Sequence, residues 1–202
     1  MPQLLKVEKL SESNLINTAV FAAVWGLMEI SIGTFLHASK IPFRGAIMSL
    51  AAIFILVSAR SVLNYKGSLI LLGIVTATFR LFLGVGFNIT PFVAILIESL
   101  IAEIILNRVG YSRISSVITG ASVMIYTLLH GLIMQAVFLG MDIYKVYYEL
   151  VLSFTNKIGL SENVVLIALL TVPVIHLTFG AISASFGYSV GRQIQKLMEN
   201  EK

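Results

Sequence analysis

Residues 15–37, LINTAVFAAVWGLMEISIGTFLH, decide the fold class of this chain. The stretch holds about 23 residues, and a helix that rises about 1.5 Å per residue would cross a hydrocarbon core of roughly 30 Å. Glu29 is its one charged side chain. The sequence therefore predicts a membrane-spanning helix with a carboxylate inside it.

The composition extends this prediction to the whole chain. The 202 residues are 57% hydrophobic and 12% charged, which is far more apolar than a soluble domain. We expect an all-α integral membrane protein in which residues 1–202 form a single domain. The formal charge of +4 comes from basic residues set singly at the ends of apolar runs, which indicates membrane topology rather than nucleic-acid binding. The absence of cysteine excludes disulfides and thiolate metal ligands.

Apolar runs separated by polar turns predict a bundle of six membrane-spanning helices. The expected spans cover residues 15–37, 45–63, 68–87, 92–106, 114–139 and 164–188. Residues 140–163 are a tyrosine-rich connection, and two interpretations of it stay open: a lid, or an amphipathic helix in the membrane interface. The charged residues 192–202 predict a short helix in water. Nine lysines and arginines lie on the side of both termini and four on the other side, so we expect both termini in the cytoplasm.

Ionisable side chains lie at a similar depth in four of these spans. Counted from the outer end of each span, Glu29, Arg80, Glu98 and His130 lie roughly 10 to 14 Å below the outer surface. His176 lies nearer the midplane. Because unpaired charges are costly in lipid, we expect a shared interior pocket that opens to the outside. A purely structural network, with Arg80 paired to Glu98 or Glu29, is the alternative.

The inner half of the first expected helix carries small residues on one face. At about 100° per residue, Ala19, Ala22 and Gly26 share this face, and Ala23 lies at its edge. Small residues allow another helix to approach closely. Two interpretations stay open: packing within this chain, or docking of a partner helix.

Four features together resemble those of a known family: six spans in about 200 residues, cytoplasmic termini, the A-x-x-x-A motif at Ala19 and Ala23, and the outer polar layer. The chain resembles the substrate-binding (S) component of an energy-coupling factor (ECF) transporter. The resemblance implies that Ala19 and Ala23, continued by Ala22 and Gly26, dock onto a membrane coupling subunit driven by two cytoplasmic ATPase subunits. It also implies location in a prokaryotic plasma membrane.

On this resemblance the chain is not an enzyme but captures a small water-soluble, vitamin-like solute outside and releases it inside. The residues expected to bind the solute are Glu29, Arg80, Asn88, Glu98, His130 and His176. Carboxylates, a guanidinium and imidazoles suit a small zwitterion or a heteroaromatic ring. We expect no cofactor and no resident metal. The chain lacks a G-x-x-x-x-G-K-[ST] loop, so ATP would bind to partner subunits.

Three other hypotheses stay open. A stand-alone secondary transporter or channel would couple Glu29, Glu98 or Glu103 to protons. An intramembrane serine protease, in partial resemblance to the rhomboid family, would pair Ser122 with His176. A metal site would require His37, His130, His176 and a glutamate to converge, because nitrogen and carboxylate ligands suit Zn, Ni or Co.

Overall fold

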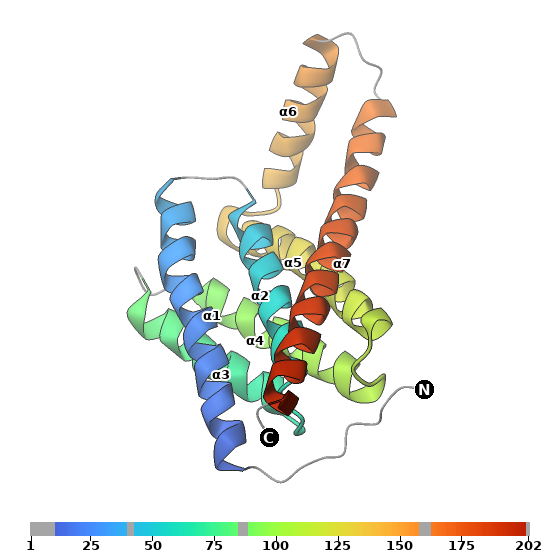
Figure 1. Cartoon of the computed structure of the whole chain (residues 1–202). Coiled ribbons are helices and arrows are strands. Elements are labelled where there is room, and N and C mark those ends of the chain that lie inside the picture. The colour runs from blue at the N-terminus through green and yellow to red at the C-terminus, as the bar shows by residue number, and fades with distance from the viewer. Residues whose placement is uncertain (1–10, 40–42, 85–88, 158–162, 201–202) are drawn as a thin grey trace.

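The computed structural model describes residues 11–39, 43–84, 89–157 and 163–200. These residues fold into seven α-helices, namely α1 (Glu12–Ala38), α2 (Arg44–Arg60), α3 (Ser68–Leu83), α4 (Ile89–Arg108), α5 (Arg113–Leu139), α6 (Ile143–Lys157) and α7 (Asn163–Asn200) (Figure 1). The described residues confirm the all-α class expected from the sequence.

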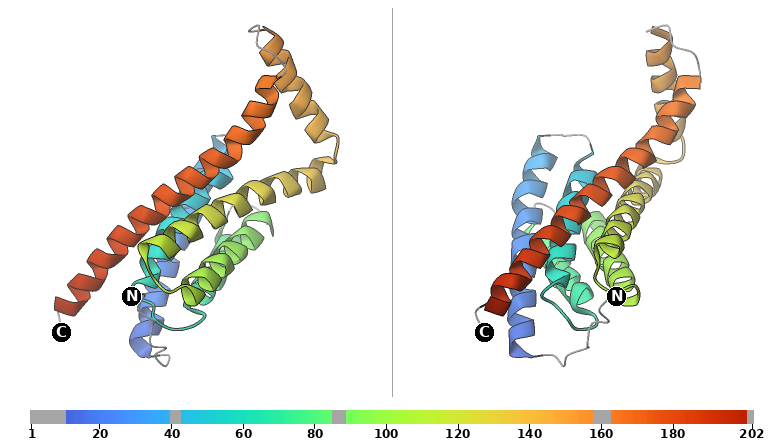
Figure 2. Two further views of the ribbon diagram at one scale, coloured as in Figure 1. Left: turned by 90° about the vertical axis from the view of Figure 1, so that its right-hand side faces the viewer. Right: turned by 45° about the vertical axis from the view of Figure 1, so that its right-hand side comes forward.

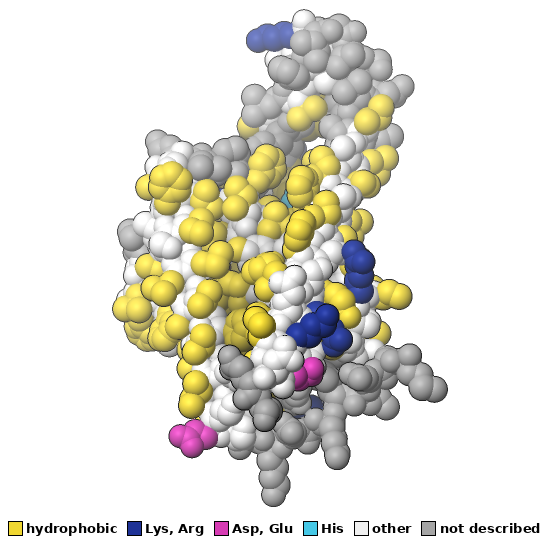
Figure 3. All heavy atoms as spheres, viewed as in Figure 1, with side chains coloured by type: hydrophobic (Ala, Val, Ile, Leu, Met, Phe, Trp, Pro, Cys, Tyr) yellow, Lys and Arg dark blue, Asp and Glu magenta, His cyan; other side chains and the backbone are white. Residues whose placement is uncertain are grey.

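Four helices in the described ranges are long and apolar enough to cross a membrane: α1, α4, α5 and the Leu170–Asn200 part of α7. With 17 and 16 residues, α2 and α3 are shorter, although each matches an expected span. Large apolar side chains cover the outer surface, as Figure 3 shows for one face, and Leu27 and Phe82 are 67% and 75% exposed. Such a surface belongs against lipid. The molecule is a multi-pass membrane protein, and six spans stay a prediction.

The structure bears on two segments that the sequence left less certain, the connection before the last span and the charged tail. Residues 143–157 of the expected connection form α6, which agrees in secondary structure with the interfacial-helix interpretation. The expected tail is continuous with the last span, because α7 runs without a break to Asn200. No proline follows Pro173 to end this helix, and Gly191 fits closely against Ser61 and Tyr111, so tertiary packing offsets the cost of a glycine within a helix.

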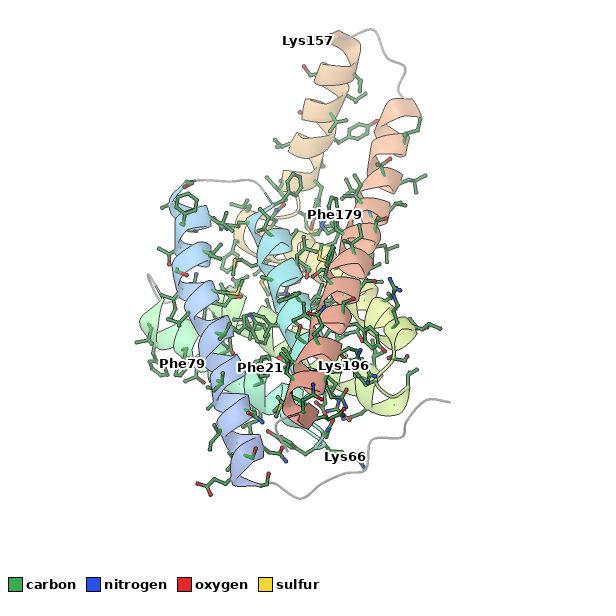
Figure 4. All side chains as sticks on the ribbon, in the orientation of Figure 1. Phe21, Lys66, Phe79, Lys157, Phe179 and Lys196 are labelled. Atoms are coloured by element: carbon green, nitrogen blue, oxygen red, sulfur yellow. The ribbon has the colours of Figure 1, made fainter. Side chains whose placement is uncertain are left out.

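The helices place chain segments at two distinct ends of the bundle. The first residues of α1, the last residues of α7 and the α2–α3 and α4–α5 turns lie at one end (Figures 1 and 2). Lys66 and Lys196 also lie there, whereas Lys157 lies at the tip of α6 (Figure 4). We call the first end the basic end. At the other end, α6 and the first half of α7 project beyond α1 and α2.

α7 packs closely against both α5 and α2 through small residues. A Cβ added at Gly120 of α5 would meet the backbone carbonyl of Gly180, so the two helices touch backbone to backbone. Towards α2, the hydroxyl of Ser58 donates to the carbonyl of Gly187 at 3.1 Å. The hydroxyl of Ser183 donates to a carbonyl of α2 at 2.7 Å. The glycine-rich half of the last expected span is therefore an internal packing face.

Arg60 of α2 and Glu103 of α4 form a buried ion pair at the basic end, with Nη1 3.8 Å from Oε2. The two carboxylate oxygens accept the backbone N–H groups of Gly67 at 2.5 Å and Leu69 at 2.9 Å. These groups begin α3, where unpaired N–H groups and the helix dipole favour a carboxylate. Asn107 bonds to both charged side chains. The three side chains of Arg60, Glu103 and Asn107, which we call the α2–α4 lock, tie together three helices.

Candidate binding site

An ion pair joins α1 to α3 within the expected polar layer. Arg80 Nε lies 3.9 Å from Glu29 Oε2, and Trp25 Nε1 donates to Glu29 Oε1 at 3.3 Å. The side chains of Arg80 and Glu29 are only 13% and 6% exposed. At membrane depth each charge lowers the cost of burying the other. This is one of the two pairings that the sequence allowed for Arg80.

Glu98 of α4 accepts hydrogen bonds from the two helices that flank it. The Ser49 hydroxyl of α2 donates to Glu98 Oε1. The Thr127 hydroxyl of α5 lies 3.4 Å from the same oxygen and 2.8 Å from Ser49 Oγ. Glu98 is 3% exposed. These hydrogen bonds therefore satisfy a carboxyl group that is buried within the protein.

Glu98 lies near both the ion pair and a tyrosine–histidine pair on α5. It lies within electrostatic range of both Glu29 and Tyr126. The Tyr126 hydroxyl is 3.1 Å from His130 Nδ1, and the two ring centres are 5.4 Å apart. Side chains from five helices therefore form one polar cluster. Its members are Trp25, Glu29, Ser49, Arg80, Glu98, Tyr126, Thr127 and His130.

Within the described residues, one N–H donor of the ion pair makes no hydrogen bond, and there is free space beside the carboxylate of Glu29. Arg80 Nε is buried and donates no hydrogen bond within the described residues. A Cβ added at Gly84 would collide with both Arg80 Nη1 and the Arg80 carbonyl, so the glycine leaves room for the guanidinium beside the end of α3. A Cβ added at Gly33 would lie 3.8 Å from Glu29 Oε2 and 3.9 Å from Met48, at ordinary contact distance. There is thus room for at least a methyl group beside the carboxylate.

Two of the expected binding residues lie apart from this cluster. His176 is 7% exposed, and its Nδ1 lies 2.9 Å from the carbonyl of Val172, one turn earlier in α7. Within the described ranges, no hydrogen bond or ion pair links His176 to the cluster. Asn88, the expected cap, lies outside the described residues. Of the six expected binding residues, four meet: Glu29, Arg80, Glu98 and His130.

The small face of α1 divides between interior and surface. Ala22 and Gly26 are buried against α3: the Thr76 hydroxyl donates to the Ala22 carbonyl at 3.4 Å, and Phe79 covers Gly26. These two residues therefore pack against α3 within the chain, and docking of a partner at them stays a prediction. Ala19 is exposed and Ala23 is half-buried. Partner docking through these two alanines stays a prediction.

The alternative sites gain no supporting contact in the described part of the chain. No group of three or more histidine, aspartate or glutamate side chains there could hold a metal ion, and His37 is exposed. Ser122 and His176 share no hydrogen bond among the described contacts. Gly120, beside Ser122, instead forms the close crossing with Gly180. That contact accounts for the glycine at position 120 by packing.

Sequence reasoning missed the uncharged members of the cluster. Ser49, Thr127 and Tyr126 lie in expected spans, but hydroxyl side chains are common in membrane helices and readily bond to their own backbone. Thr127 does this as well, donating to the Val123 carbonyl at 3.0 Å. A sequence signal was available for Tyr126, which precedes His130 by one helical turn. Ser49 could not be found in this way, because its partner is on another helix.

The assembled cluster can exchange charge and hydrogen bonds with a small polar molecule. It offers an anion, a cation with an unused N–H group, a carboxyl group between two hydroxyls, and an imidazole beside a phenol. Comparisons with models of protein families, with curated proteins and with solved structures found no match for this chain.

Proposed function

We propose that this chain binds a small polar solute at the polar cluster and serves as the S component of an ECF-type importer. The observation that carries the proposal is the Glu29–Arg80 pair, together with the nearby buried Glu98, which is hydrogen-bonded to hydroxyl groups from α2 and α5. Placing several charges at membrane depth is costly, and such groups usually mark a ligand or ion pathway. The bundle could be locked more cheaply with apolar side chains.

A zwitterionic solute fits this arrangement best. Glu29 and Arg80 are 3.9 Å apart, beyond hydrogen-bond distance, and Arg80 Nε has no hydrogen-bond acceptor within the described residues. A ligand with a carboxylate and an ammonium group could bond to Arg80 and Glu29 in turn and replace a long ion pair with two charge-assisted hydrogen bonds. A heteroaromatic ring with donor and acceptor edges would use Tyr126 and His130.

Trp25 provides the measurement that tests solute binding. It is the chain's only tryptophan, it is fully buried, and it donates to Glu29. We expect zwitterionic amino acids or water-soluble vitamins to change its fluorescence in purified protein. Glu29→Gln or Arg80→Gln should weaken binding about tenfold or more, since each removes a charged hydrogen-bonding group. Glu149→Gln, which changes an exposed carboxylate on α6, is the control.

Mass spectrometry of the small molecules that co-elute with the protein from its native membrane extends this test to unknown ligands. A solute that is retained by the wild type and by Glu149→Gln, and lost from folded Glu29→Gln, would support the proposal. Equal retention by Glu29→Gln, Arg80→Gln and the wild type would contradict the assignment of the site.

Docking to a coupling subunit is tested at Ala19, which is exposed on α1. Ala19→Trp should abolish association with the coupling subunit and solute uptake while solute binding by the isolated chain survives, because a bulky ring prevents close helix approach. Val20→Trp is the matched control, since Val20 is 55% exposed on an adjacent part of the same helix. Co-purification and uptake measure the effect. Normal uptake by Ala19→Trp would argue against docking there.

Glu98 favours a second candidate function, a stand-alone proton-coupled transporter. Its carboxyl group is 3% exposed and bonds to hydroxyls that can adapt to either protonation state. In that case the purified chain in liposomes would move solute on a pH gradient without ATPase subunits, and Glu98→Gln would remove the dependence on the gradient. An S component alone would not respond to the gradient.

A further inference from the structure

A groove of about 430 Å³ lies on the outer surface between α7 and the beginning of α5. Six residues of α7 between positions 178 and 189 line its length, and Arg113 is the only charged lining residue in the part of the chain that the structure describes. Ile182 and Phe186 are 46% and 64% exposed. The groove is therefore an apolar channel with one cation, on a surface that faces lipid.

Three polar side chains of α7 line the groove, those of Thr178, Ser185 and Ser189, and two of them are hydrogen-bonded within α7. Thr178 donates its hydroxyl to the carbonyl of Val174 at 2.8 Å, and Ser189 donates to the carbonyl of Ser185 at 2.9 Å. Both hydroxyls are thus bonded to their own helix. Because these side chains are small, they leave space in the groove for a hydrocarbon chain.

Arg113 lies at the Ser189 end of the groove. Figure 2 shows α5 and α7 running in roughly opposite directions, and they cross at Gly120 and Gly180, so Arg113, which precedes Gly120, lies on the Ser189 side of the crossing. The groove then extends about 16 Å along α7 from Ser189 to Thr178, towards the middle of the bundle. This length and direction match an acyl chain with its headgroup at Arg113.

The basic end supplies the complementary charge for an anionic headgroup. Arg113 is exposed, and it forms no ion pair or hydrogen bond with any described residue. Arg108 and Arg113 flank the α4–α5 turn, and Arg192 of α7 lies within electrostatic range of Tyr111 in that turn. Burial and the neighbouring Tyr188 raise the pKa of the Tyr111 hydroxyl, so this tyrosine adds no negative charge. Among the described residues, no acidic side chain lines the groove.

We propose that this groove is a binding site for an anionic phospholipid, with the phosphate at Arg113 and one acyl chain along residues 178–189. Basic residues beside membrane helices attract anionic headgroups, and an arginine forms paired hydrogen bonds with phosphate oxygens. The site is separate from the polar cluster, and it does not depend on the proposed transport function.

Native mass spectrometry of the full chain from nanodiscs of equal phosphatidylglycerol and phosphatidylcholine tests the proposal. The wild type should retain phosphatidylglycerol about fivefold over phosphatidylcholine, the selectivity expected from one arginine near the headgroup. Arg113→Gln should reduce the ratio to near one. Arg108→Gln should keep it, because Arg108 is an exposed arginine of the same turn that does not line the groove.

Ser185→Leu adds a test of the acyl-chain position, because a leucine there would fill the groove. This variant should lose the tightly retained lipid while its thermal midpoint, measured after delipidation, stays close to that of the wild type. Equal loss of selectivity in Arg113→Gln and Arg108→Gln would show diffuse attraction and overturn the site. Retention of the lipid by Ser185→Leu would overturn the site as well. So would a crosslinking experiment at Ile182 that captures a second protein chain in place of lipid.

Discussion

Replacing Gly120 by alanine is expected to lower the free energy of unfolding by about 3 kcal/mol, at the upper end of the usual cost of overpacking. The new Cβ would meet the carbonyl of Gly180 and would lie 2.7 Å from Ala184 Cβ. Backbone atoms cannot rotate away as a flexible side chain can, so α5 and α7 must separate. Unfolding in detergent mixtures, followed by circular dichroism, measures the loss.

Gly131→Ala is a matched control on the same helix. A Cβ added at Gly131 meets nothing within 4 Å, so the change should stabilise the helix by up to about 1 kcal/mol through helix propensity alone. Alanine gains the same propensity at both positions, and the difference between the two variants therefore isolates the collision. Similar stability of the two variants would mean that α5 and α7 do not cross backbone to backbone.

Replacing Glu103 by leucine is expected to cost about 3–5 kcal/mol, the range for removing one partner of a buried ion pair. The change leaves Arg60, which is 1% exposed, without its counter-charge, and it leaves the N–H groups of Gly67 and Leu69 without their acceptor. A leucine is similar in size but can satisfy none of these donors. Chemical unfolding at constant detergent concentration gives the value.

A double-mutant cycle with Arg60→Met separates the two parts of this cost. If the α2–α4 lock acts as a pair, the double variant should be more stable than the sum of the two single losses predicts, by about 1–3 kcal/mol. The N–H groups of α3 stay unsatisfied in the double variant, so recovery should be incomplete. Strict additivity would contradict coupling between Arg60 and Glu103. Glu149→Gln, an exposed change, should alter stability by less than about 0.5 kcal/mol.

Hydrophobic run length predicted most of the helices, because each run must satisfy its own backbone in lipid. The spans expected at residues 15–37, 92–106 and 114–139 correspond to α1, α4 and α5. The continuation of α7 to Asn200 was not predicted. In that region the chain is charged, and the packing of Gly191 against Ser61 and Tyr111 involves residues far apart in the sequence.

The sequence predicted the members of the candidate site only where the depth of a residue in the membrane was enough to place it. Glu29, Arg80, Glu98 and His130 were expected in one layer, since each residue advances a helix by a fixed rise and the membrane fixes the origin. Depth gives no information on the angle at which a helix is turned towards its neighbours. His176 was expected somewhat deeper among the binding residues, yet its Nδ1 lies against the Val172 carbonyl of its own helix.

The small face of α1 illustrates the same limit. Its residues suit both an internal neighbour and an external partner, since closeness of approach depends on size in either case. The tertiary structure decided in favour of α3 at Ala22 and Gly26 and left Ala19 exposed.

By itself, then, the sequence determined an all-α membrane protein with ionisable groups at a common depth, because hydrophobicity and helical rise are local properties of the chain. Only the tertiary structure decided that Arg80 faces Glu29, that Ser49 and Thr127 hold Glu98, and that Arg60 pairs with Glu103. Each of these contacts joins different helices, and their rotation and crossing are set by how small residues such as Gly120 and Gly180 let the backbones meet.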